Sequence, residues 1–443
     1  MSYTETTSVS WFSRLRSSFG GIGFGILLIL GGTFLLWSNE GRFVATGDAL
    51  TEAQGVTQEL GNIATLDSSK NGQLVHATGP VTTTDVLVDP IFNVSANAIR
   101  LERSVEYYQW TETSKSEKRK KVGGGEETVT TYTYQMAWVS SPVNSSAFKS
   151  PEAAANRVNT IKMPLEKETL QATTVNFGAY KLPKSMISLI SGPVSLSVNM
   201  PDETREALNA QLAPKVIPAP VQTPPASPVR AEGASAWEDI PAGAQQSSDT
   251  THVSAVEQAP VPAPVIEMVH VLGDTIYVGE APARPEIGDM RVAFKQVLPG
   301  TISILAKLNG DTFESYRAAN GKTVLDLSMG TLSLENMYGD AHSSNSTMTW
   351  ILRILGALLV IFGLKMVMAP LAVVASVIPF LGDIVGAGTG IICFLLGGAW
   401  SLLIISIAWL RFRPIIGGAL LAVAVLLIVL SYLKGRGSKA AKA

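Results

Sequence analysis

Residues 19–37 read FGGIGFGILLILGGTFLLW, which is 19 residues without a charged side chain. A helix that crosses the ~30 Å hydrocarbon core of a bilayer needs about 20 such residues. A signal peptide with Arg14 and Arg16 as its basic region is the alternative, but the apolar part is long for one. In addition, the residues that follow this stretch, 38–42, are polar and do not form the small-residue cleavage site of a signal peptide. We therefore predict an uncleaved transmembrane helix, preceded by a tail of residues 1–18.

Three further apolar stretches lie near the C-terminus. Residues 350–369 carry charges only near their two ends, and residues 384–410 and 414–433 carry none. Residues 371–383 are also apolar, but a proline and a glycine break them and they are too short to span. We predict four transmembrane helices, with residues 371–383 as an interfacial or re-entrant segment.

The basic residues of the two tails predict the orientation. Arg14 and Arg16 precede the first span, and the basic tail of residues 434–443 follows the last. Because cytoplasmic segments are enriched in Lys and Arg, both tails are expected in the cytoplasm. Four spans then place residues 41–348 outside.

Arg411 and Arg413 disagree with this orientation, because four spans leave them on the outer face. A five-span alternative, which divides residues 371–410 into two spans, moves them inside but carries the basic tail out. We retain four spans and take both arginines as candidates for binding lipid headgroups or an acidic partner.

The large segment between the first two spans is predicted to be an extracytoplasmic, β-rich (α+β) domain in two parts, residues 41–213 and 265–348. Between them, residues 214–264 hold ten prolines and no apolar periodicity, which predicts a disordered linker. Residues 104–112 and 128–139 are rich in aromatic and β-branched residues and predict a hairpin. The basic, glycine-containing residues between them predict a solvated tip.

A short internal similarity suggests two copies of one β unit. Val75-His76-x-x-Gly79 recurs as Val269-His270-x-x-Gly273. Chance is the alternative, since only five or six positions match. Two true copies would place both histidines at equivalent strand positions.

Composition narrows the functional classes. Charged residues are 16% of the chain, against about 25% in soluble proteins, and the mean hydropathy is +0.25. The net charge of −2 gives no reason to expect nucleic-acid binding. A single cysteine, Cys393, excludes an intrachain disulfide and a cysteine zinc cage. Searches for HExxH, GxSxG and CxxC find nothing, so we expect no catalytic residue, cofactor or metal site.

Several short motifs together resemble one family. They are Asn39-Glu40-Gly41-Arg42, Leu74-Val75-His76 with Gly79, Arg103-x-Val105-Glu106-x-Tyr108-Gln109-Trp110-x-Glu112, Tyr132-x-Tyr134 with Trp138, Arg284-Pro285-Glu286-Ile287-Gly288-Asp289-Met290-Arg291-Val292, Ser344-Asn345-Ser346 with Thr349-Trp350, and Arg413-Pro414. As a set they are similar to the transmembrane protein 43 (LUMA) family. That resemblance implies four spans, one large luminal or extracytoplasmic domain, and no enzymatic activity.

The resemblance also implies a location and a role. Eukaryotic members of that family lie in the endoplasmic reticulum and inner nuclear membrane and are implicated in organising membrane protein complexes. The Pro-rich insertion departs from the eukaryotic pattern, so we expect a bacterial inner-membrane protein with a periplasmic domain. We expect a non-enzymatic multi-pass scaffold whose partners are membrane lipids, other membrane proteins and further copies of itself. A lipid-handling protein or lipid-active enzyme, with a site between the β domain and the outer leaflet, is the alternative.

Small residues in the spans are candidates for helix packing. Gly21 and Gly25 are four residues apart, and Gly397 and Gly398 are adjacent. Residues four apart lie on one helix face, where a missing side chain lets two backbones approach closely. We expect Gly21 and Gly25, on an otherwise isolated first span, to pack between copies, and Gly397 and Gly398 to pack within one chain.

Deleting residues 218–260 should leave the thermal midpoint of the purified protein unchanged, because a segment without apolar periodicity contributes no core. Differential scanning fluorimetry of the shortened and full-length chains is the measurement. A clearly lower midpoint in the shortened chain would show that the segment packs on the β domain.

Overall fold

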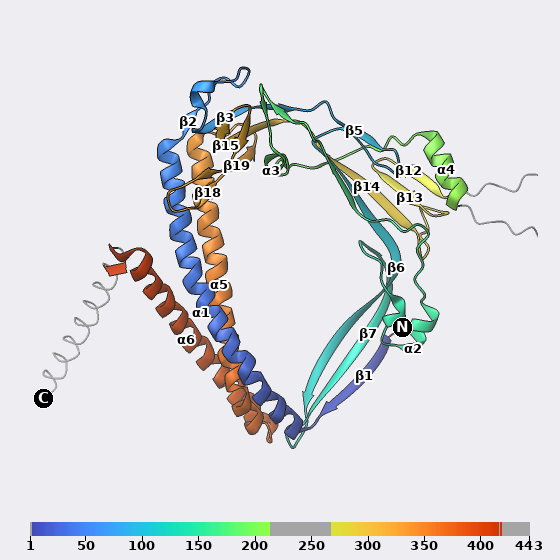
Figure 1. Ribbon diagram of the computed structural model, residues 1–443. Coiled ribbons are helices and arrows are strands. Elements are labelled where there is room, and N and C mark those ends of the chain that lie inside the picture. Colours follow the sequence, from blue (N-terminus) through green and yellow to red (C-terminus); the bar gives the residue numbers. More distant parts are fainter. Residues whose placement is uncertain (1, 213–266, 416, 419–443) are drawn as a thin grey trace, which may run out of the picture.

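The computed structural model describes residues 2–212, 267–415 and 417–418, and these residues form a closed frame (Figure 1). Long helices make one side, two β-sheets lie across the top and the upper part of the opposite side, and a narrow ribbon of strands runs back down to the helix ends. The predicted linker at residues 214–264, the basic tail at 434–443 and nearly all of the predicted span at 414–433 lie outside the described residues.

Three helices of the described chain are long and apolar enough to cross a membrane. They are α1 (Trp11–Val56), α5 (Leu334–Ala375) and α6 (Pro379–Phe412). At 1.5 Å per residue, the 46 residues of α1 extend about 69 Å, so the first span continues without a break into the β-rich part. The predicted class, α-helical spans with a large β-rich domain, is confirmed.

Residues 371–383 do not form an element separate from the predicted spans, whereas their position at the membrane interface stays a prediction. Helix α5 continues through Pro370 to Ala375, and α6 begins at Pro379. Proline is well tolerated at the first turn of a helix, because its missing N–H would have no partner there. The segment therefore consists of two helix ends and a short turn. The five-span alternative does not fit either, since α6 is one helix.

The sheet at the top joins the helices to the rest of the domain. Its strand order is β19-β15-β16-β10-β9-β3-β2, and an additional β15–β3 pairing closes five of these strands into a circuit. The strands are β2 (Gln58–Glu59), β3 (Leu74–Thr82), β9 (Asn176–Phe177), β10 (Tyr180–Lys181), β15 (Thr301–Asn309), β16 (Thr312–Glu314) and β19 (Asp326–Met329). Phe177, Ile304 and Phe313 are among its core residues, and α3 (Lys184–Ile187) covers it.

The second sheet continues the frame away from the helices. Its order is β1-β7-β6-β14-β13-β12, with β11 on β14 and β8 on β6. The strands are β1 (Ser2–Val9), β6 (Arg100–Lys120), β7 (Glu126–Val139), β8 (Glu168–Gln171), β11 (Val194–Ser195), β12 (Val269–Leu272), β13 (Thr275–Val278) and β14 (Met290–Val297). Small elements complete the domain: β4 (Val86–Val88), β5 (Ser95–Asn97), β17 (Tyr316–Arg317), β18 (Thr323–Val324), α2 (Pro151–Asn156) and α4 (Asp202–Leu212).

The interpretation of two repeated β units was wrong. The strands that carry the matching motifs, β3 and β12, lie in different sheets, and each sheet takes strands from both sides of the linker. The two histidines also differ in their surroundings. His76 is buried and bonds Glu59 and the Leu332 carbonyl, whereas His270 is half-buried and bonds the Gly279 carbonyl.

The predicted hairpin is present but longer than expected. Strand β6 continues to Lys120 and pairs with β7 along its full lower length, so the turn shrinks to residues 121–125. Gly123 and Gly124 adopt φ values of +88° and +81° there, which side chains rarely tolerate. The basic residues predicted for a solvated tip therefore lie on a strand.

The N-terminal tail is part of the β structure. Strand β1 lies antiparallel to β7, in register from Ser2 with Thr133 to Val9 with Glu126. The prediction placed residues 1–18 and residues 41–213 on opposite sides of the membrane. It fails for this strand, because residues of the two segments share one ladder.

Helices α1 and α5 pack closely at glycines. A Cβ atom on Gly25 would lie 2.7 Å from the Gly363 carbonyl oxygen, and one on Gly32 would lie 2.8 Å from that of Gly356. We expected the first span to be isolated, with Gly21 and Gly25 facing another copy. That was wrong for Gly25, which packs against α5 of the same chain.

The remaining glycine candidates behave differently from one another. A Cβ on Gly21 would meet the Met366 methyl group at an ordinary 3.6 Å. Gly397 packs within the chain as expected, since a Cβ there would lie 2.6 Å from the Ile361 side chain. Gly398 has no described neighbour within 4 Å.

Gly32→Ala should lower the thermal midpoint of the detergent-solubilised protein, because its methyl group would push α1 and α5 apart. Gly31→Ala is the matched control, since no described atom lies within 4 Å of that position and alanine favours helix. Equal midpoints for the two variants would contradict the close α1–α5 contact.

Candidate functional site

The glycine seam between α1 and α5 leads into a polar layer. Asn39 follows Gly32 by seven residues, and Thr349 precedes Gly356 by seven. A seven-residue repeat keeps successive layers on the same face of a packed helix pair. Asn39 is only 2% exposed and donates from Nδ2 to the Thr349 carbonyl oxygen at 3.1 Å.

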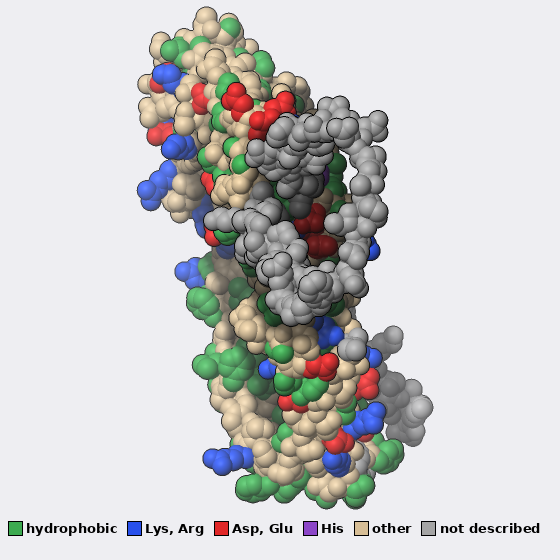
Figure 2. All heavy atoms as spheres, turned by 90° about the vertical axis from the view of Figure 1, so that its right-hand side faces the viewer, with side chains coloured by type: hydrophobic (Ala, Val, Ile, Leu, Met, Phe, Trp, Pro, Cys, Tyr) green, Lys and Arg blue, Asp and Glu red, His purple; other side chains and the backbone are tan. Residues whose placement is uncertain are grey.

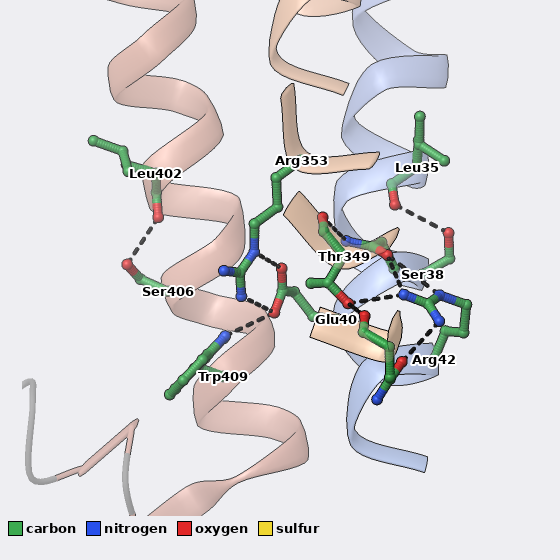
Figure 3. A network of polar contacts seen from close by, with 11 residues as sticks. Leu35, Ser38, Glu40, Arg42, Thr349, Arg353, Leu402, Ser406 and Trp409 are labelled. Atoms are coloured by element: carbon green, nitrogen blue, oxygen red, sulfur yellow. Dashed lines mark hydrogen bonds and ion pairs between the residues drawn. The ribbon is translucent and has the colours of Figure 1, made fainter. Parts of the chain in front are cut away.

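A buried ion pair lies beside this layer (Figure 3). Glu40 of α1 is 0% exposed, and Arg353 of α5 donates to both of its carboxylate oxygens, at 2.6 and 2.7 Å. The indole Nε1–H of Trp409 on α6 donates to the same carboxylate at 2.7 Å. One carboxylate therefore joins all three described apolar helices.

Arg42 makes a second set of bonds on the other side of α1 (Figure 3). Its guanidinium donates to Asn345 Oδ1 at 2.9 Å, Thr349 Oγ1 at 2.8 Å and Asn39 Oδ1 at 3.2 Å. Asn345 in turn donates to the Phe43 carbonyl oxygen at 3.0 Å. We call Asn39, Glu40, Arg42, Asn345, Thr349, Arg353 and Trp409 the interhelix network.

The interhelix network marks the boundary between the apolar helices and the β domain. It begins two residues after the uncharged stretch 19–37. On its far side, Ala49, Leu50 and Ala53 of α1 pack with Leu305 of the top sheet and Tyr338 of α5. A buried charge is tolerated only when it is paired and hydrogen-bonded, and this network meets that requirement.

A groove opens next to the interhelix network, between α1, α5 and the top sheet. Its volume is about 530 Å³, and its lining combines Arg42, Asp326 and Asp340 with Leu50 and Met348. Burial, and to a smaller extent the charge on Asp340, raise the pKa of Asp326, although the Leu327 N–H donates to it. The groove is thus polar on some walls and apolar on others.

The two predicted headgroup candidates lie at the same end of the helices as the interhelix network. The Arg413 guanidinium lies 5.6 Å from the centre of the Phe43 ring, and Arg411 lies 5.8 Å from that of Phe412. Within residues 2–212, 267–415 and 417–418, neither arginine forms an ion pair. Both remain candidates for an anionic headgroup.

The hairpin tip docks at the opposite end of the helices. The Gly123 N–H donates to the Val377 carbonyl oxygen at 3.2 Å. Gly124 lies against the ring of Trp11, the first residue of α1, whose indole N–H donates to the Val373 carbonyl oxygen of α5 at 2.9 Å. Arg14 lies 3.4 Å from Glu126, and Lys120 pairs with Asp383. The β structure is therefore attached to both ends of the helix bundle.

The sequence predicted roles for the glycines and for Arg411 and Arg413, but it did not predict the Glu40–Arg353 ion pair. Glu40 was noted only as part of a motif, and Arg353 only as a charge near the end of a span. Two seven-residue repeats in the sequence could have indicated it: Gly25-Gly32-Asn39 and Thr349-Gly356-Gly363. On two antiparallel helices, these repeats bring glycine opposite glycine and Asn39 opposite Thr349. In the described ranges no group of three or more His, Cys, Asp or Glu side chains could hold a metal ion.

Comparisons with known proteins point to one family. The family model described as transmembrane protein 43 matches residues 107–414, more than two thirds of the chain. Transmembrane protein 43 of Mus musculus is 26% identical over 422 residues, covering 93% of this chain and 89% of the mouse protein. The Homo sapiens protein is 25% identical with the same coverage. A transmembrane protein 43 homolog of Drosophila melanogaster is 25% identical over 92% of this chain and 93% of its own length. No solved structure matches.

Glu40→Gln should destabilise the protein by about 3–5 kcal/mol, because it leaves the buried Arg353 charge without its counter-ion. The measurement is the thermal midpoint in detergent, with Asp311→Asn as the control for an exposed ion pair with Lys181. A midpoint that falls no further for Glu40→Gln than for the control would contradict a structural role for the pair.

Asp326→Asn should stabilise the protein near neutral pH. A raised pKa in the folded state means that the folded chain binds this proton more tightly than the unfolded chain does. The favourable contribution is therefore complete below the unfolded value of about 4 and is lost as pH rises through the folded pKa. The difference in thermal midpoint between variant and wild type should shrink as pH falls, and a difference that is constant with pH would refute the assignment.

Proposed function

The chain belongs to the transmembrane protein 43 family, and we propose that it is a non-enzymatic membrane scaffold. In this role the β domain holds other membrane proteins, or the lipid around them, in a fixed position relative to the helices. The proposed location is a bacterial inner membrane, with the top sheet and the upper part of the second sheet in the periplasm.

The observation that supports this proposal is the attachment of the β structure at two separate points. At one end, the interhelix network and the packing of Leu50 against Leu305 hold the top sheet on α1 and α5. At the other end, the Gly123 N–H donates to the Val377 carbonyl oxygen in the turn after α5, and Lys120 of the hairpin pairs with Asp383 of α6. A body held at two distant points keeps its orientation, and a fixed orientation is what a scaffold requires.

The charge distribution supports the proposed orientation. The hairpin tip carries Lys118, Arg119, Lys120 and Lys121, and it lies at the same end of the helices as Arg14 and Arg16. A concentration of basic residues at one end favours the cytoplasmic side for that end. The top sheet and the upper part of the second sheet then lie outside.

A lipid-handling role is the second candidate, and the groove beside the interhelix network favours it. The groove lies where the apolar helices meet the β domain, next to Arg42 and with Leu50, Leu305 and Met348 in its lining. A site that combines apolar walls with polar groups at the membrane boundary suits a lipid headgroup and the first part of its chains.

Affinity purification from native membranes tests the scaffold. Wild type should retain one or more membrane proteins at a constant ratio, and Trp11→Ala should lose them because the hairpin tip loses the ring that lies against Gly124. Phe12→Ala is the matched control, since Phe12 is 70% exposed. Equal recovery of these proteins with Trp11→Ala, or no enriched protein with wild type, would contradict the scaffold.

Lipid analysis of the same samples tests the second candidate. Ser344 lines the groove, whereas the neighbouring exposed Ser343 does not. If the groove holds lipid, Ser344→Trp should remove one defined lipid species from the purified protein while Ser343→Trp leaves it. Identical lipid profiles for both variants would exclude the groove as a lipid site.

A further inference from the structure

We propose that a second copy of this chain pairs with the edge of the polar ribbon, and that copies joined in this way close into a ring. The polar ribbon is β1, residues 111–120 of β6 and residues 126–135 of β7. This inference rests on the proposed scaffold and names its first partner.

The polar ribbon has a core only at its upper end, where Tyr134 is buried and Tyr3 and Tyr132 pack against it. Below this end it has no buried side chain. All residues from Thr113 to Lys120 are exposed, as are seven of the eight residues of β1. Seen from this side, acidic and basic side chains are interspersed over the lower part of the molecule (Figure 2). A few strands without a buried face are marginally stable in water, so a ribbon of this kind favours further pairing.

The polar ribbon has two open edges in the described part of the chain. Strand β1 pairs only with β7, and residues 111–120 of β6 also pair only with β7. Asn159 closes the β6 edge at Trp110, where it accepts from the N–H at 2.7 Å and donates to the carbonyl at 3.0 Å. Below Trp110, no described residue bonds to the outward-facing backbone groups of β6.

The pairing register identifies the backbone groups that point outward. Tyr108 and Trp110 direct their backbone groups away from β7, so alternate residues below them, such as Ser116, do the same. On β1 the same alternation leaves Ser2, Thr4, Thr6 and Ser8 facing outward. Long open edges of this kind are templates for a strand of another chain.

The membrane makes open edges untenable here. The polar ribbon descends on the side of the frame opposite α1, α5 and α6 and meets them at their far end (Figure 1). Its ten β6 residues extend about 33 Å, close to the ~30 Å of a hydrocarbon core. Charged side chains and unpaired backbone groups cannot face lipid over that depth.

A ring of copies resolves this conflict. Helices on the outside would meet lipid with their exposed apolar side chains, which include Phe24, Leu27, Phe34, Ile354, Phe362 and Leu395. Ribbons on the inside would pair edge to edge, and closure of a sheet removes its edges.

The directions of the strands permit this closure. Strands β1 and β6 are both antiparallel to β7, so they run the same way. A copy rotated about an axis along the strands would bring its β6 edge beside β1 of its neighbour as a parallel pair. Such a contact joins two different patches and generates a ring when the rotation closes.

Crosslinking in native membranes tests the ring. In a Cys393→Ser background, Thr6→Cys combined with Ser116→Cys should give a ladder of bands at multiples of the chain mass with a short bis-maleimide. Thr6→Cys combined with Val271→Cys is the control, because Val271 lies on the distant edge strand β12 and is exposed. No ladder, or a band at the mass of a different protein, overturns the proposal.

A proline variant separates edge pairing from folding. Thr4→Pro removes an N–H that points to the open edge and none that bonds β7. It should abolish the ladder in a chain that carries the two crosslinking cysteines, without lowering the thermal midpoint. A ladder that persists overturns edge pairing. If crosslinks are absent while membrane proteins still copurify with wild type, the ring fails and the scaffold stands.

Discussion

The Glu40–Arg353 pair is the interaction on which the arrangement of the helices depends. It is buried at the level where the apolar parts of the three helices end, and each helix contributes one member: the carboxylate from α1, the guanidinium from α5 and the indole N–H from α6. Apolar contacts alone would allow these helices to slide or rotate in lipid, because lipid tails match leucine side chains equally well. A paired charge allows only one register, since any shift would leave a buried charge without its partner.

The glycine seam and the ion pair act together. Gly25 and Gly32 bring α1 close to Gly363 and Gly356, and the same seven-residue spacing then places Asn39 against Thr349. Close backbones fix the distance between the helices, while the polar layer fixes their register. The top sheet is held on the same two helices through Leu50 and Tyr338, so its position follows from that of the helix pair.

Much of the fold could be predicted from local pattern. The uncharged stretch 19–37 and the aromatic strands around Tyr108 and Trp138 carry their structure in their own residues, and both are present as helix α1 and the β6–β7 hairpin. The N-terminal strand could not be predicted, because Ser2–Val9 has no buried face and its partner lies more than 110 residues away. The similar histidine motifs led to the wrong prediction of a repeat for a related reason. The place of a strand in a sheet depends on its distant partners, and β3 and β12 have different partners.

The candidate site was only partly predictable, and the reason is physical. A charge near the end of an apolar stretch, such as Arg353, ordinarily belongs to a side chain that reaches water. Whether it instead turns inward depends on a counter-ion that another helix supplies, and only the packing of Gly32 on Gly356 brings Glu40 within reach. The two sides of the frame also differ in the groups that they expose. The helices satisfy their backbone internally and expose apolar side chains, whereas the strands that descend opposite them expose polar side chains and open edges. Two surfaces of such opposite character on the two sides of one frame suit different surroundings, and the proposed ring gives each surface its own.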